Sequence, residues 1–102
     1  MGATMNTNGE DVTVNLNAAE QRFEAQIAGQ TALVAFSKSG HDIVFTHTEV
    51  PDALQGRGIG NKLAHAALEY AREQQLTVVP LCPFVAAYIR KHPEYQSLVR
   101  PT

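Results

Sequence analysis

Gly56, Gly58 and Gly60 lie where the one long amphipathic helix that the sequence predicts begins, and this helix runs from Ile59 to about Gln74. Glycine has no side chain, so glycines at alternating positions let the backbone come close to another group. The first N–H groups of a helix have no partner inside the helix and lie at the positive end of its dipole. Anions, most often phosphates, bind at such positions. We therefore predict that this segment binds a pyrophosphate.

Two better-known phosphate-binding loops have a different spacing. A dinucleotide-binding loop needs G-x-G-x-x-G in a strand–helix–strand unit, whereas the glycines here follow G-x-G-x-G after what reads as an antiparallel meander. A nucleotide-binding P-loop needs Gly-Lys followed by Ser or Thr, and the sequence does not contain that motif. A loop that turns sharply and binds nothing remains the alternative.

The spacing of Gln55, Gly58 and Gly60 as Q-x-x-G-x-G resembles the acetyl-coenzyme A signature, [QR]-x-x-G-x-[GA], of the GNAT N-acetyltransferase superfamily. Three further blocks extend the resemblance to the short, single-domain, YjdJ-type branch of GNAT-like proteins. These blocks are His47-Thr48-Glu49-Val50-Pro51, Val79-Pro80-Leu81-Cys82-Pro83-Phe84-Val85 and His92-Pro93-Glu94-Tyr95. The resemblance runs from about residue 11 to the C-terminus.

The resemblance implies that acetyl-CoA is bound, with its pyrophosphate on main-chain N–H groups and its pantetheine arm between two diverging strands. Pro51 and Pro80 fit such a divergence, because proline lacks the N–H that a regular ladder needs. Hydrogen bonds to charged groups contribute roughly 1.5–3 kcal/mol each, and three of them approach the ~8 kcal/mol of a micromolar complex. The residues predicted to contact the coenzyme are Val50, Gln55, Gly56, Arg57, Gly58, Ile59, Gly60, Asn61, Cys82 and Pro83.

Acetyl transfer from a thioester to an amine requires a neutral amine. About one lysine-like amine in a thousand is neutral near pH 7.4, so deprotonation costs about 4 kcal/mol, and a general base helps to supply it. Strand alternation places Phe45, His47 and Glu49 on one face, unless a bulge reverses the alternation. Glu49 is the predicted base and His47 the second candidate. The structural alternatives are a strand-end carboxylate bonded to backbone amides and a structural histidine.

Cys82 and Tyr88 are the other candidate catalytic residues. Cys82 ends the last predicted strand just before a helix start, where a thiolate is stabilised. We predict that it lies near the acetyl group, either as a transient acetyl carrier or as a small buried side chain. The resemblance places Tyr88 as the general acid for the leaving thiolate, and a core aromatic is its alternative. His92 and Tyr95 are predicted to fasten the C-terminal segment to the sheet.

Hydrophobic periodicity predicts the elements that position these residues. Apolar residues at every second position predict four strands joined by short turns as an antiparallel meander, at residues 12–17, 22–27, 31–37 and 42–50. The run from Ala32 to Phe36 is apolar throughout, which predicts burial on both faces of that strand.

The C-terminal half is predicted to continue as helix, strand, helix. After the long helix, Thr77–Leu81 reads as a short strand parallel to the fourth, and Phe84–Lys91 as a second helix with Pro83 in its first turn. The predicted fold class is α+β, in the order β-β-β-β-α-β-α. It corresponds to a minimal GNAT-like fold without the helices that usually lie between the first and second strands.

Length, charge and composition limit the domain organisation, the partners and the location of the protein. The chain has 102 residues, a net charge of −2 and one cysteine. These values predict a single domain at residues 11–102 after a flexible segment at residues 1–10, with no nucleic-acid partner and no disulfide. They also predict a cytoplasmic location. No apolar run in the sequence approaches ~18 residues, so no membrane span is predicted. His41, His47, His65 and His92 show no paired spacing, so no metal site is predicted.

The leading hypothesis is an acetyl-CoA-dependent N-acetyltransferase that transfers the acetyl group directly to an amine. The acceptor that carries this amine is unidentified and is either a small molecule or a protein. A non-catalytic module that binds acetyl-CoA or CoA is the alternative, and a plain interaction scaffold is a third possibility. Binding of the coenzyme separates the third from the first two, and acetylation of an amine separates the first from the second.

Overall fold

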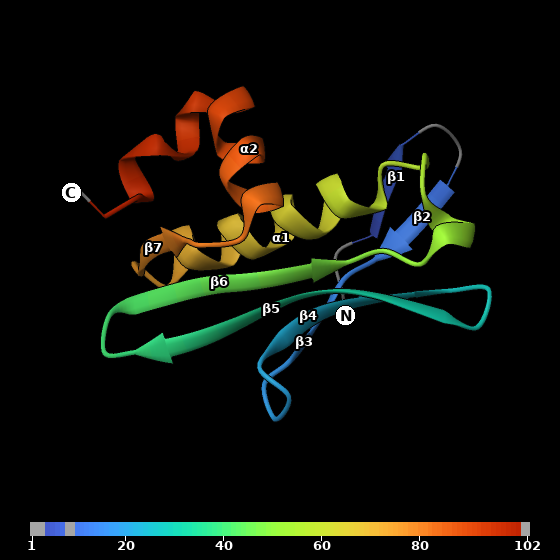
Figure 1. The fold of residues 1–102 in the computed structure, drawn as a ribbon, viewed down its shortest axis with the longest axis horizontal. Helices are drawn as coiled ribbons and strands as arrows, with labels where there is room; N and C mark the ends of the chain where they lie inside the picture. The colour runs from blue at the N-terminus through green and yellow to red at the C-terminus, as the bar shows by residue number, and fades with distance from the viewer. Residues whose placement is uncertain (1–3, 8–9, 101–102) are drawn as a thin grey trace.

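The computed structural model describes residues 4–7 and 10–100. Its central element is a five-stranded sheet in the order β3-β4-β5-β6-β7, and β1 and β2 form a separate two-stranded sheet (Figure 1). The strands are β1 Thr4–Thr7, β2 Glu10–Thr13, β3 Asn15–Asn17, β4 Arg22–Ile27, β5 Gln30–Ser39, β6 Asp42–Glu49 and β7 Thr77–Pro80. The helices are α1 Ile59–Glu73 and α2 Pro83–Lys91, with short 3-10 helices η1 at Asp52–Leu54 and η2 at Pro93–Leu98.

The predicted α+β fold and its order of strands and helices are confirmed from β4 onward. Strands β3 to β6 pair antiparallel with their neighbours, and β7 pairs parallel with β6. The turn between β4 and β5 has positive φ at Ala28 (52°) and Gly29 (77°). Two consecutive positive φ values characterise the tight turns whose twist matches that of the adjoining strands.

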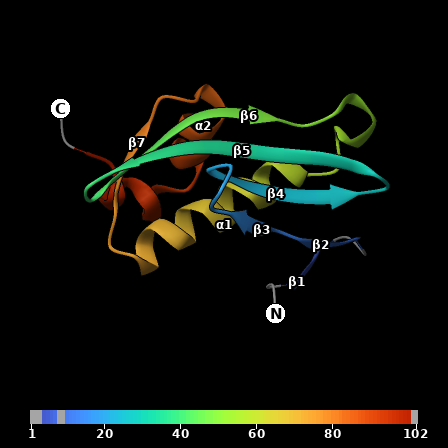
Figure 2. The ribbon, with the colours of Figure 1, turned by 90° about the horizontal axis from the view of Figure 1, so that it is seen from below.

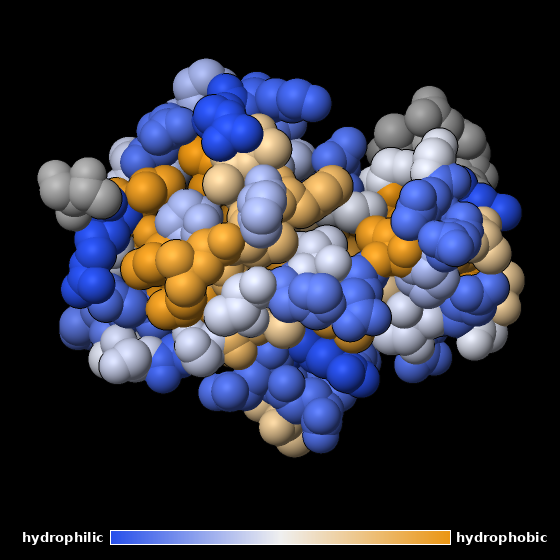
Figure 3. All heavy atoms as spheres, in the orientation of Figure 1, coloured by the Kyte–Doolittle hydropathy of each residue, from blue (hydrophilic) through white to orange (hydrophobic). Residues whose placement is uncertain are grey.

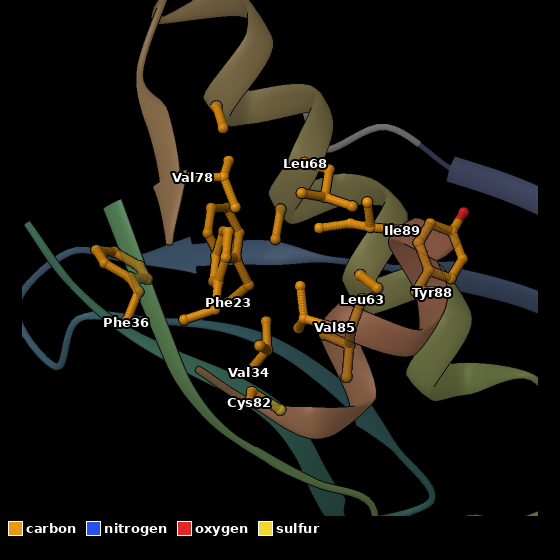
Figure 4. Packing of buried hydrophobic residues seen from close by; sticks show 14 of the residues in the cluster. Phe23, Val34, Phe36, Leu63, Leu68, Val78, Cys82, Val85, Tyr88 and Ile89 are labelled. Carbon is orange, nitrogen blue, oxygen red and sulfur yellow. The ribbon is translucent and has the colours of Figure 1, made fainter. Parts of the chain in front are cut away.

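Both helices cover the same face of the sheet, as Figures 1 and 2 show from two directions. Apolar side chains of α1 and α2 meet those of the sheet in one buried cluster (Figure 4). Burying one such side chain contributes about 1.5–3 kcal/mol, so this cluster fixes the helices against the strands. Its members include Phe23, Val34 and Phe36 from the sheet, Leu63 and Leu68 from α1, and Val85 and Ile89 from α2.

The other face of the sheet is only partly covered, so the prediction that β5 is buried on both faces was wrong. Ala32, Val34 and Phe36 are buried, whereas Leu33 and Ala35 between them are half-exposed. The physical reason is that both helices of the described chain pack on the opposite face. Figure 3 shows apolar surface over β7 and the adjoining part of β6, and Leu81, just after β7, is 67% exposed.

The first predicted strand, at residues 12–17, is divided in the structure. The chain leaves strand geometry at Val14, so β2 and β3 belong to different sheets. Strand β1 was not predicted, because Thr4–Thr7 falls in the segment at residues 1–10 that we expected to be flexible. Residues 1–3 and 8–9 of that segment lie outside the described residues. Apolar periodicity could not reveal β1, which reads Thr-Met-Asn-Thr.

Candidate functional site

A pocket of about 410 Å³ lies where β6 ends and α1 begins. The loop between these elements forms one side of the pocket, and the start of α2 contributes Phe84 to its wall. Seven of the ten residues predicted to contact the coenzyme line this pocket, so the structure brings most of that set together. The lining residues are Thr48, Val50, Leu54, Gln55, Gly56, Gly58, Ile59, Gly60, Asn61 and Phe84.

The backbone of the loop exposes main-chain donors at the start of α1. Gly56 and Gly58 have φ values of 83° and 73°, in the left-handed region that favours glycine. Gly58 is the N-cap residue, and no side chain caps the helix there. The first helical hydrogen bond runs from the Lys62 N–H to the Gly58 carbonyl over 3.1 Å. The N–H groups of Ile59, Gly60 and Asn61 therefore precede the helical ladder and can bind an anion.

Gly60 has a different role from the two loop glycines. Its φ is not in the left-handed region, but a Cβ atom at this position would lie 2.7 Å from Cζ of Phe84. The phenyl ring of Phe84 thus packs directly on the backbone of α1. Gly60 lets the first turns of α1 and α2 approach each other, and the ring of Phe84 closes one wall of the pocket.

Gln55 braces the loop with its side chain. Its Nε2 donates to the Val50 carbonyl over 3.2 Å and to Asp52 Oδ1 over 3.4 Å. Leu54, which is 1% exposed, anchors the same loop in the core, and its N–H donates to the Pro51 carbonyl over 2.8 Å. These contacts fix the loop conformation, and with it the position of the glycine N–H groups.

A β-bulge changes the predicted alternation of β6. Ala35 pairs with His47 and the next residue, Phe36, pairs with Phe45, so Thr46 is an extra residue in β6. The prediction that His47 and Glu49 share a face with Phe45 was therefore wrong. Phe45 is buried, whereas the side chains of His47 and Glu49 are 57% and 62% exposed. The bulge is the exception that the sequence left open, because one added residue reverses every later side chain.

His47 and Glu49 form a pair on the exposed side of β6. The distance from His47 Nε2 to Glu49 Oε2 is 2.7 Å, within hydrogen-bond range. Neither side chain lines the pocket, but both are on the strand that contributes Thr48 to it. The two candidate bases thus lie together, across the sheet from the helices.

Strands β6 and β7 part beyond the pair Phe45–Pro80, as the two prolines predicted. One further main-chain bond joins them, from the Cys82 N–H to the Phe45 carbonyl over 2.8 Å. The Thr48 hydroxyl then lies 3.1 Å from Cys82 Sγ. Cys82 is 3% exposed and sits at the turn into α2 (Figure 4). Cys82 therefore lies behind Thr48, which faces the pocket.

Tyr88 lies away from the pocket. Its ring stacks on His92 at a centroid distance of 4.0 Å, and its hydroxyl points away from Cys82 in Figure 4. Burial raises the pKa of Tyr88, and the nearby Glu94 carboxylate adds to that effect. Its position in this structure matches a core aromatic, and its role as a general acid stays a prediction.

Tyr95 fastens the C-terminal segment to α1 and not to the sheet, contrary to the prediction. Its hydroxyl donates to Glu69 Oε2 over 2.6 Å and lies 3.0 Å from Nδ1 of His65. The hydrogen bond from Tyr95 lowers the pKa of Glu69, which also pairs with Arg72. Burial and the same hydrogen bond raise the pKa of Tyr95.

Three predicted coenzyme contacts fall outside the pocket lining. The Arg57 side chain is exposed, Pro83 is the first residue of α2, and Cys82 is buried behind Thr48. Thr48, Leu54 and Phe84 line the pocket but were not predicted. Thr48 faces the pocket only because of the bulge, which the sequence does not reveal. Phe84 directly follows Pro83 at the predicted start of the second helix, and this position could have indicated that it lines the pocket.

Comparisons with known proteins show the family of this chain. A profile of the GCN5-related N-acetyl-transferase family matches residues 22–98, which include β4 to β7 and both helices. The chain belongs to the GCN5-related N-acetyltransferase family. The resemblance inferred from the four sequence blocks is thereby confirmed.

Several known proteins are similar to this chain over most of its length. Protein NATD1 of Mus musculus is 34% identical over 95 residues, covering 90% of this chain and 86% of its own. Protein NATD1 of Homo sapiens is 37% identical over 89 residues, covering 86% and 71%. The NMR solution structure of a GCN5-like protein from Staphylococcus aureus superposes with a TM-score of 0.68 at 27% identity, covering 87% of this chain and 88% of that one.

Two other kinds of structural feature, a metal site and a membrane-spanning helix, are absent from the described residues. That part of the chain holds no group of three or more His, Cys, Asp or Glu side chains that could bind a metal ion. No helix described in it is long and apolar enough to cross a membrane.

Proposed function

We propose that this protein binds acetyl-CoA in the pocket at the start of α1 and transfers the acetyl group to the amine of an acceptor. The observation that carries the proposal is the agreement between that pocket and the acetyl-CoA motif. Gln55, Gly58 and Gly60, the three motif positions, all line it. Family membership supports the same ligand.

The pocket suits a ligand with an anionic end and a long, less polar arm. The N–H groups of Ile59, Gly60 and Asn61 at the start of α1 can donate to the pyrophosphate. Val50, Leu54 and Phe84 provide apolar walls along which the pantetheine arm can lie. Bound there, acetyl-CoA supplies an activated acetyl group at the parted end of β6 and β7.

The amine must lose a proton before it attacks the thioester carbonyl. In our proposal Glu49 accepts this proton, directly or through a water molecule. His47 orients the Glu49 carboxylate, or shares its charge, across their 2.7 Å contact. The exposed position of the pair lets an acceptor approach from the face of the sheet that the helices leave free. The C–N bond forms, the C–S bond breaks, and the CoA thiolate receives a proton from solvent or an acid.

The uncovered face also favours a second candidate function. Between β3 and β4 the chain makes only a short turn at residues 18–21, so no helix there shapes an acceptor pocket. A domain that binds acetyl-CoA and presents it to a partner needs no such pocket. This non-catalytic function is the alternative to transfer.

Release of free thiol from acetyl-CoA tests the proposal. The purified protein is incubated with acetyl-CoA and a panel of small amines and lysine-containing peptides, and thiol release and acetylated product are both measured. Amine-dependent release is the expected result. Saturable binding of acetyl-CoA without release across the panel would instead support the binding module, and no binding would contradict both.

A further inference from the structure

We infer that Thr48 and Cys82 together restrict the bound acyl group to the two carbons of acetyl. The inference rests on the proposed function, because it assumes that an acyl-CoA occupies the pocket at the start of α1. It adds a specificity-determining pair to that site, and Thr48 was not among the residues predicted from sequence.

Thr48 marks the inner end of the pocket. Most lining residues belong to the loop or to the first turn of α1, where the pyrophosphate is expected. Val50, just after the end of β6, and Thr48, on β6, continue the lining, and Thr48 is the lining residue farthest from the loop along this stretch. An arm that runs from the glycine N–H groups along β6 therefore brings its acyl end to Thr48.

The Thr48 side chain cannot move back, because Cys82 stands behind it. The 3.1 Å contact between Thr48 Oγ1 and Cys82 Sγ joins the two parted strands. Cys82 is itself held by its N–H bond to the Phe45 carbonyl, and it is 3% exposed within the core. Val85, which is fully buried, belongs to the same core cluster. The inner end of the pocket is thus closed by a packed contact and not by a mobile surface side chain.

A longer acyl chain would have to break this contact. Protein interiors are close-packed, so extra methylenes are accommodated only by displacing neighbours. An apolar chain pushed against Thr48 would also separate its hydroxyl from Cys82 without offering another partner. Discrimination by one methylene in a closed apolar pocket is typically about 10–200-fold. Butyryl-CoA is therefore expected to bind at least about tenfold more weakly than acetyl-CoA.

Isothermal titration calorimetry with CoA, acetyl-CoA, butyryl-CoA and hexanoyl-CoA tests the inference without requiring transfer activity. The proteins compared are the wild type, Thr48→Ala, Thr48→Ser and Cys82→Ala. Thr46→Ala is the matched control, because Thr46 is on the same strand but exposed, with its hydroxyl 3.4 Å from the Ala35 carbonyl. A thermal melt of each variant confirms that it is folded.

The expected result is a wild type that binds acetyl-CoA more tightly than butyryl-CoA. The ratio of these two affinities should fall at least about threefold in Thr48→Ala and Cys82→Ala. Thr48→Ser keeps the hydroxyl and loses one methyl group, so it should lie between these variants and the wild type, and Thr46→Ala should equal the wild type. Equal wild-type affinities for acetyl-CoA and butyryl-CoA would overturn the inference alone. A wild-type preference that Thr48→Ala and Cys82→Ala leave unchanged would do the same. Absence of CoA binding by the folded wild type would overturn the proposed function together with it.

Discussion

Phe84 packs its ring on the backbone of Gly60, so closely that a Cβ atom there would lie 2.7 Å from the ring. This single contact joins the first turn of α1 to that of α2 and forms one wall of the pocket. The ring itself is 39% exposed. A ligand in the pocket that contacts the Phe84 ring would explain why a large apolar side chain is this exposed.

Gly60→Ala should alter the pocket more than the stability. Alanine favours a helix over glycine by about 1 kcal/mol, but the new methyl group must displace the Phe84 ring. We expect a change in unfolding free energy below about 1 kcal/mol and clearly weaker binding of CoA. In a Phe84→Ala background the clash is absent, so Gly60→Ala should then stabilise. Urea unfolding of all four proteins gives this double-mutant cycle, and additive effects would contradict the contact.

Tyr95→Phe should destabilise the protein in a pH-dependent way. The Tyr95 hydroxyl donates to the Glu69 carboxylate and lowers its pKa below the ordinary value of 4.5. A carboxyl group whose pKa is lower in the folded than in the unfolded state stabilises the fold fully at pH values above its unfolded pKa. This stabilisation is lost as the pH falls through the folded pKa. Loss of the bond should therefore cost about 1.5–3 kcal/mol near pH 7.

The difference between wild type and Tyr95→Phe should shrink as the pH falls from 4.5 through the lowered folded pKa of Glu69, because the folded carboxylate becomes protonated there. Urea unfolding at several pH values measures it. Tyr88→Phe is the control, because among the described residues the hydroxyl that donates to Glu69 is that of Tyr95 and not that of Tyr88. A pH-independent difference for Tyr95→Phe would show that the bond does not favour the ionised carboxylate.

Glu49→Gln should slow acetyl transfer without weakening coenzyme binding. General-base catalysis contributes typically 10²–10⁴-fold, so kcat should fall by about 10²-fold or more. The side chain is exposed and does not line the pocket, so the affinity for CoA should stay within about twofold. Glu94→Gln, a change at another exposed carboxylate in η2, is the control. Unchanged turnover in Glu49→Gln would exclude Glu49 as the base.

Cys82 should not become acetylated during turnover. Its Sγ is buried behind the Thr48 hydroxyl, so the acetyl group bound in the pocket does not reach it. The acetyl group should therefore pass directly to the amine, without an acetyl-cysteine. Intact-mass measurement after incubation with acetyl-CoA should show no acetyl adduct. An adduct that disappears in Cys82→Ser would contradict direct transfer and favour a two-step reaction through the thiol.

The parts of the fold that were predicted correctly are those in which a local pattern decides the structure. Helix α1 follows from apolar residues at helical spacing, and the start of α2 from Pro83. The glycine loop was located because glycine at a positive φ has few substitutes, as Gly58 shows. These features need no knowledge of distant contacts.

The parts that were missed depend on contacts between distant residues. The bulge at Thr46 leaves no trace in the alternation of apolar residues beyond Phe45, so the side of β6 that bears Thr48 could not be read. The bond between Tyr95 and Glu69 joins residues 26 apart in sequence. The burial of β5 on one face only depends on where the helices pack, which is a property of the whole chain.

Titration calorimetry of acetyl-CoA against wild type, Gly58→Ala and Gly40→Ala tests the central claim that main-chain N–H groups at the start of α1 hold the coenzyme. Both glycines have positive φ, 73° and 62°, and in both cases a Cβ atom would meet nothing within 4 Å. Each substitution should therefore cost a similar 1–2 kcal/mol or so of stability. Only Gly58 lines the pocket, whereas Gly40 lies in the turn between β5 and β6.

The account predicts a roughly micromolar dissociation constant for the wild type. It also predicts affinity unchanged in Gly40→Ala and at least about tenfold weaker in Gly58→Ala, because alanine disfavours the left-handed φ of Gly58 that orients the following N–H groups. A tenfold loss is about the contribution of one hydrogen bond to a charged group. No heat of binding with the wild type, or equal affinity in all three proteins, would contradict it.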